Sequence, residues 1–120
     1  PFAPACLSEK VNAIFDDGPS KSPHMLFNYK IKGRKFPAIT HVDKTARVQT
    51  VEPNSGNLRE ILQSYFLQTG KPLLLNTSLN GPGEPILNTP ENCINFIKKS
   101  DIDAIFIGKY KISRIKYSNN

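Results

Sequence analysis

The sequence has no apolar run that could cross a bilayer, since a spanning helix needs about 20 apolar residues. It also shows no signal-peptide pattern. Cysteine is scarce: Cys6 and Cys93 lie far apart and are interpreted as two reduced thiols of a cytoplasmic protein. Two histidines and two scattered cysteines give no metal-ligand spacing. We therefore expect no membrane partner and no metal bound by this chain.

Acidic residues are also in short supply, with 10 Asp and Glu against 16 Lys and Arg and a net charge of +6. The basic residues gather at residues 30–35 and in the tail from Lys109 to Lys116. Such clusters fit a solvated surface, a small polyanionic ligand or nucleic acid. Aromatic residues do not interleave with them as in a surface that binds single strands. Nucleic acid is therefore not the partner that we expect.

The chain has 120 residues, of which 38% are hydrophobic, and this suits one domain with a modest core. Apolar alternation predicts strands at residues 25–32 and 45–51, and apolar runs predict strands at residues 73–75 and 103–108. Helices are predicted between them, so the fold class should be α/β with a single domain over residues 1–120. Because the sequence opens at Pro1 without methionine, it is expected to be a processed product or an excised piece.

Helix boundaries carry clear local signals. Ser8 can cap a short helix that continues to about Phe15. Asn57 and Glu60 fit a capping pair for a second helix, which Gly70 should end in a left-handed conformation. Thr89, followed by proline and glutamate, predicts the start of a third.

Residues 73–86 form the densest candidate site. Three leucines predict a fully buried strand, after which polar side chains gather at Asn76, Thr77, Ser78 and Asn80 before a sharp Gly-Pro-Gly turn. Ligands of open α/β sheets bind at such strand ends. The alternative is a turn in which these side chains satisfy their own backbone. The pattern is neither a Walker loop nor a dinucleotide fingerprint.

Arg47 is the second candidate, on a strand face that it shares with Thr45 and Gln49. It could clamp a phosphate or carboxylate with two hydrogen bonds, or it could be an exposed arginine on an outer sheet face. His41 and Asp43 should share one strand face, as an acid/base pair, as partners of a metal-bound phosphate or as a structural hydrogen bond.

These motifs resemble a known family. Residues 36–51 are similar to the "PAVTHVDGTARVQTV" block of the O-carbamoyltransferases, which carbamoylate nodulation factors, cephamycin and tobramycin. Residues 73–86 resemble that family's "LLNTSFNxxGEPI" block. Residues 1–4, 22–25 and 101–104 resemble its "RPFAP", "SPFM" and "IDAL" segments. The similarity covers almost the whole chain in the family's order.

The resemblance implies a C-terminal YrdC-like domain, a twisted mixed sheet with flanking helices, incomplete at its N-terminal side. It implies that carbamoyl phosphate and ATP, with Mg²⁺, give carbamoyl-adenylate. A separate N-terminal domain with an iron-type metal, absent here, would transfer the carbamoyl group to a hydroxyl acceptor. Catalytic roles are implied for Arg47, Asn76 and Ser78. Substrate and nucleotide binding is implied for those three and for His41, Asp43, Thr45, Thr77 and Asn80. The piece alone is expected to be inactive, and a homodimer is left open.

Three positions depart from the family pattern. Lys44 stands for the usual glycine, Leu79 for phenylalanine, and Gly81-Pro82 for a pair that often carries arginine. The alternatives are a related carbamoylation, in hydrogenase maturation or tRNA threonylcarbamoylation, and a non-catalytic module that binds nucleotides or nucleic acid. The order of the motifs favours the O-carbamoyltransferases.

Overall fold

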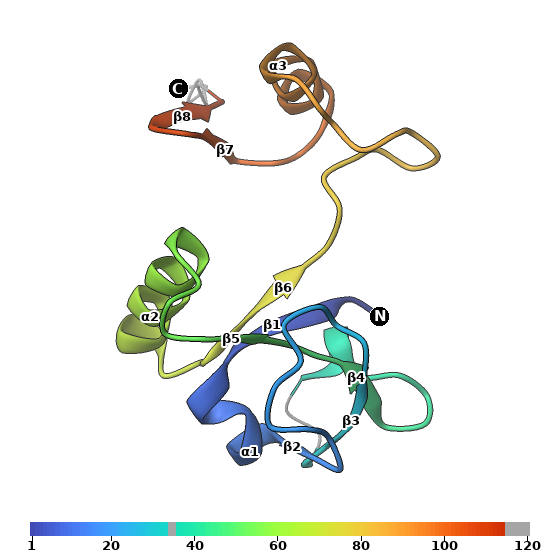
Figure 1. The fold of residues 1–120 in the computed structure, drawn as a ribbon. Coiled ribbons are helices and arrows are strands. Elements are labelled where there is room, and N and C mark those ends of the chain that lie inside the picture. Colours follow the sequence, from blue (N-terminus) through green and yellow to red (C-terminus); the bar gives the residue numbers. More distant parts are fainter. Residues whose placement is uncertain (34–35, 115–120) are drawn as a thin grey trace, which may run out of the picture. The chain divides into compact units, whose positions relative to one another are not determined.

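A computed structural model describes residues 1–33 and 36–114 of the chain (Figure 1). The basic residues Arg34, Lys35 and Lys116 of the predicted clusters lie outside this described part. The chain divides into two units, residues 1–77 and residues 78–120. Both mix helices with strands, so the predicted α/β class is confirmed. None of the helices in the described ranges has the length and apolar character that a membrane crossing requires.

The first unit contains two three-stranded sheets. In one, β1 (Ala3–Leu7) lies between β5 (Gln49–Val51), which is parallel to it, and β6 (Leu73–Asn76), which is antiparallel. In the other, β3 (Asn28–Ile31) lies between β2 (Phe15–Asp16) and β4 (Thr45–Arg47), both antiparallel. The predicted strand at residues 25–32 is therefore shorter than expected, because Met25 has a left-handed φ of 55° and cannot extend it.

Strand β1 separates two hydrophobic cores, one on each of its faces. Ala5 and Leu7 point toward α2 (Asn57–Thr69), where they pack with Val51 and Leu62. Cys6 points to the opposite face and packs with a larger cluster, which includes residues of β3, β4 and the helix α1 (Val11–Ile14). Burial raises the pKa of the Cys6 thiol to about 12, so this thiol stays protonated and behaves as a small apolar group.

Three local predictions need correction. Gly56 with a φ of 62°, not Asn57, is the N-cap of α2, and no side chain caps it. The segment from Ser8 is a 3-10 turn, Ser8–Lys10, followed by the short α1, and Ser8 does not cap α1. Leu75 of β6 is 49% exposed, so β6 is not the fully buried strand predicted from its leucines. The predicted left-handed end of α2 at Gly70 is confirmed, with a φ of 69°.

The second unit holds α3 (Pro90–Lys99) and a hairpin of β7 (Ala104–Ile107) with β8 (Tyr110–Ser113). The predicted start of α3 is confirmed, because the Thr89 side chain accepts a hydrogen bond from the Asn92 amide at 3.1 Å. Ile97 of α3 and Ile105 of β7 are the most deeply buried large apolar residues in the described part of the second unit.

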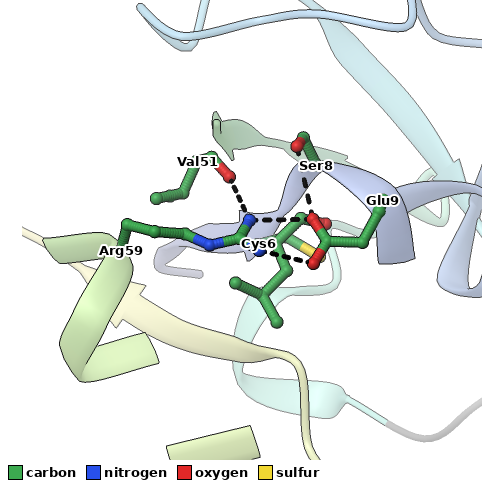
Figure 2. Close-up of polar contacts among 6 residues, drawn as sticks. Cys6, Ser8, Glu9, Val51 and Arg59 are labelled. Atoms are coloured by element: carbon green, nitrogen blue, oxygen red, sulfur yellow. Dashed lines mark hydrogen bonds and ion pairs between the residues drawn. The ribbon is translucent and has the colours of Figure 1, made fainter. Parts of the chain in front are cut away.

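An ion pair joins the start of α2 to the 3-10 turn that follows β1. Arg59 donates to both carboxylate oxygens of Glu9, at 2.6 and 2.8 Å, and to the carbonyl oxygen of Val51 at 3.1 Å (Figure 2). Arg59 is buried, whereas the side chain of Glu9 is 47% exposed. These hydrogen bonds lower the pKa of Glu9 from 4.5 to about 2.

The stability of the first unit should therefore depend on pH in the acid range. Because the folded pKa of Glu9 is depressed, its contribution is complete above pH 4.5 and disappears as the pH falls toward 2. The exposure of Glu9 limits this contribution to about 1–2 kcal/mol. We expect urea unfolding at pH 7 to show the parent chain more stable than Glu9→Gln by that amount, with the difference vanishing near pH 2. A difference that stays constant with pH would refute this assignment.

Candidate functional site

Arg47 ends β4 on the polar side of an alternating strand. Its neighbours Ala46 and Val48 are buried, whereas Arg47 is exposed and lies opposite Asn28 of β3. Within the described ranges the guanidinium makes no hydrogen bond or ion pair. An exposed guanidinium without a counter-charge keeps its donors available for an anion.

Gln49 and Asn76 meet across β1, which lies between their strands. In register, Gln49 is opposite Ala5 and Asn76 is opposite Ala3, so all four side chains share one face of the sheet. The two alanines are too small to separate their longer neighbours. The Asn76 Nδ2 therefore reaches the Gln49 Oε1 at 2.6 Å. This contact joins the two motif blocks that the sequence presents as separate.

The segment from Ser22 to Met25 completes this cluster. The Ser22 amide donates to the Thr50 Oγ1 at 2.9 Å, and the Thr50 amide donates back to the Ser22 carbonyl oxygen at 3.0 Å. One residue further on, the Gln49 Nε2 donates to the Pro23 carbonyl oxygen at 3.2 Å. The Met25 sulfur lies 3.9 Å from the Asn76 Nδ2. Three segments far apart in the sequence thus meet at Asn76.

His41 and Asp43 lie in a turn and not on a strand face, so that prediction is wrong. The Lys44 amide donates to the His41 carbonyl oxygen and the His41 amide donates to the Thr45 carbonyl oxygen, each at 2.9 Å, and Lys44 adopts a φ of 64°. This left-handed backbone explains why glycine is usual at the position of Lys44. Asp43 accepts hydrogen bonds from the hydroxyl and the amide of Thr45, at 2.7 and 3.0 Å.

These hydrogen bonds give Asp43 a structural role in the turn. The Thr45 hydroxyl and amide lower the pKa of the Asp43 carboxyl, which keeps it charged as the closing group of the turn. Its negative charge would repel a phosphate. Ligand roles for His41, Asp43 and Thr45 stay predictions.

The remaining predicted residues lie at the boundary between the two units. Strand β6 ends at Asn76, so strand alternation does not place Ser78 on the face of Asn76. Thr77 closes the first unit and Ser78 opens the second. The Asn80 Nδ2 donates to the carbonyl oxygens of Gly81 and Glu84, at 3.1 and 3.0 Å, and so holds its own turn. Their binding roles stay predictions.

The second unit has a concavity of about 840 Å³ beside this turn. Asn80 lines it together with residues of α3, among them Asn92, Phe96 and Lys99. No group of three or more His, Cys, Asp or Glu residues that could hold a metal occurs in residues 1–33 and 36–114.

Gln49 is the residue that the sequence-based site omits. A signal for it exists, because Gln49 falls two residues after Arg47 in the stretch predicted as one strand, 45–51. That prediction needs correction: the stretch forms two strands, β4 and β5, which belong to different sheets. Ala3 and Ala5 give a second signal, since two small residues on one face of a strand leave room above it. The partner of Gln49 on β6 could not be found without the strand order.

Comparison with known proteins identifies the family of the chain. The sequence model of the family described as "Carbamoyltransferase C-terminus" matches residues 1–114. The nodulation protein NolNO of Sinorhizobium fredii is 36% identical over 95% of this chain and 18% of its own length. The nodulation protein NolO of Bradyrhizobium diazoefficiens is 34% identical over 95% of the chain and 22% of its own.

A relative with a named activity also matches. The 3'-hydroxymethylcephem-O-carbamoyltransferase of Amycolatopsis lactamdurans is 33% identical over 90% of this chain and 21% of its own length. The chain thus spans about one-fifth of the length of these curated relatives. The resemblance inferred from the motifs is confirmed: this chain belongs to the carbamoyltransferase C-terminus family.

Proposed function

We propose that the chain forms part of the site at which an O-carbamoyltransferase activates carbamoyl phosphate with ATP to carbamoyl-adenylate. The carbamoyl group then passes to a hydroxyl acceptor bound mainly by other parts of the enzyme. Membership of the family supports the transfer of carbamoyl groups. The relative named for 3'-hydroxymethylcephem supports an oxygen acceptor.

One observation carries the proposal: the hydrogen bond of 2.6 Å between Gln49 and Asn76. It ties the end of β6 to the start of β5, and the preceding strand β4, which belongs to the other sheet, ends at Arg47 two residues earlier in the sequence. The first unit thus holds a cationic donor at Arg47 and a neutral amide at Asn76. Such a set suits a ligand with a phosphate at one end and a carbamoyl group at the other.

The chemistry requires donors at a phosphate. Hydrolysis of carbamoyl phosphate first releases inorganic phosphate and leaves carbamate. A carbamate oxygen then attacks the α-phosphorus of ATP, the bond from that phosphorus to the bridging oxygen breaks, and pyrophosphate leaves. Negative charge on the phosphate oxygens is stabilised by fixed donors, and Arg47 can supply two of them. Mg²⁺ would arrive with ATP and would offset part of the negative charge on its phosphates.

Exchange of labelled pyrophosphate into ATP tests the proposal. Because the relatives are about five times longer, the assay uses the complete gene product that carries these residues. We expect exchange with carbamoyl phosphate and ATP together and none when carbamoyl phosphate is left out, since the adenylate cannot form without it. Exchange that is absent in both cases, or equal in both, would refute the adenylation step.

A further inference from the structure

The side-chain amide of Asn76 is oriented by a relay that begins at a backbone carbonyl. The Pro23 carbonyl oxygen can only accept, so the Gln49 Nε2 must face it, at 3.2 Å. The other end of the Gln49 amide, Oε1, then faces Asn76 and can only accept. Asn76 must therefore present its Nδ2 to Gln49, at 2.6 Å. The orientation of both amides follows from one group that cannot donate.

This relay leaves Asn76 with one open polar atom. One hydrogen of the Asn76 Nδ2 points to Gln49, and the other has the Met25 sulfur, a weak acceptor, at 3.9 Å. The Asn76 Oδ1 receives no hydrogen bond from any residue in the described ranges. Asn76 is half-buried, and its Oδ1 is not one of the fully buried polar atoms without a partner, so this oxygen is a held acceptor that a ligand can reach.

We propose that the Asn76 Oδ1 accepts a hydrogen bond from the amino group of carbamoyl phosphate, and that Gln49 is the positioning residue that makes this selective. The inference rests on the function proposed above and names the part of the substrate that the site recognises, the amino group of the carbamoyl moiety. A carbamoyl group carries an N–H where an acetyl group carries a methyl. An acceptor that faces a methyl group stays unpaired and loses hydration, so acetyl phosphate binds less well.

The proposal assigns separate tasks to two residues of the first unit. Arg47 binds the phosphate, which both ligands share, whereas Asn76 reads the group in which they differ. If the Gln49–Asn76 hydrogen bond served only to hold β5 and β6 around β1, its loss would change stability without changing the preference between ligands. The ratio of the two dissociation constants therefore separates a positioning role from a structural one.

Calorimetric titration of the complete gene product with fresh carbamoyl phosphate and with acetyl phosphate tests this. We expect the parent to prefer carbamoyl phosphate about tenfold or more. Gln49→Leu should remove most of this preference, because the Asn76 amide can then rotate and present either end. Arg47→Ala is the matched control, since it should weaken both ligands and leave their ratio unchanged.

A Gln49→Leu protein that keeps its fold and its preference would overturn the inference. If the parent binds carbamoyl phosphate without preferring it to acetyl phosphate, the inference also fails while the proposed function stands. If the parent binds neither ligand, both fail. Should Gln49→Leu not fold, Asn76→Asp and Asn76→Leu decide: the preference should survive in the first, which keeps acceptor oxygens, and disappear in the second. Equal preference in these two variants would contradict the role of Asn76.

Discussion

Replacing Arg47 with alanine is expected to lower the exchange of pyrophosphate that depends on carbamoyl phosphate by about a hundredfold or more. Arg47 is exposed and has no hydrogen bond or ion pair in the described ranges, so the fold does not need its charge. A transition state with charge on phosphate oxygens would need it, because a guanidinium holds two such oxygens at once. The exchange rate of the complete gene product measures the loss.

Three comparisons make the result specific. Arg47→Lys should recover only part of the activity, because an ammonium group is a point charge without the planar pair of donors. Lys21→Ala removes one positive charge elsewhere in the first unit, where Lys21 lies 3.9 Å from Glu52, and should leave exchange unchanged. Thermal unfolding should differ little among all of these proteins. An Arg47→Ala protein that fails to fold would instead show that this arginine is structural.

Replacing Arg59 with methionine should have the largest effect on stability, a loss of about 2–3 kcal/mol. The variant keeps the apolar stem but leaves Glu9 and the Val51 carbonyl oxygen without their donor. A fully buried pair would be costlier to break, but the 47% exposure of the Glu9 side chain lets water replace part of the interaction. Urea unfolding of the 120-residue chain at pH 7 measures the change, provided that its transition is cooperative.

A second ion pair in the chain provides the control. Arg114 lies 3.5 Å from the exposed Asp101 carboxylate, so Arg114→Met should cost less than about 1 kcal/mol. A double-mutant cycle of Arg59→Met with Glu9→Gln should show a coupling energy of about 1 kcal/mol or more. A coupling near zero would mean that Arg59 stabilises the chain by packing and by its bond to Val51, and not through Glu9.

Local sequence signals predict the helix ends where one residue type decides the backbone. Gly70 and Thr89 are confirmed because a left-handed end and an N-terminal cap depend on residues within one turn. The prediction of Asn57 as the cap is wrong because Gly56, one residue earlier, can adopt the positive φ that the chain needs there. The prediction that Leu75 is buried is wrong because an apolar run does not reveal which face of a strand is covered.

The candidate site was predictable in its parts and not in its assembly. Asn76 stands out in the sequence because it is the first polar residue after a run of leucines. Arg47 stands out because it lies on the polar face of an alternating stretch. The hydrogen bond between Gln49 and Asn76 depends on β5 and β6 both pairing with β1, and local periodicity does not give strand order. The prediction of a strand at His41 and Asp43 is wrong because polar and apolar residues alternate there although the backbone forms a turn.

The central place of β1 also dictates when the sheet can form. Cys6 is paired with Thr50 on one side and with Leu73 on the other. Strand β1 therefore cannot complete its pairing until residues 50 and 73, which are translated later, have been synthesised. Until β6 has been synthesised, at least one edge of β1 is open to pairing with another chain. Pro4 lies within this strand and has no amide hydrogen to offer, so it limits such pairing while the polypeptide is still growing.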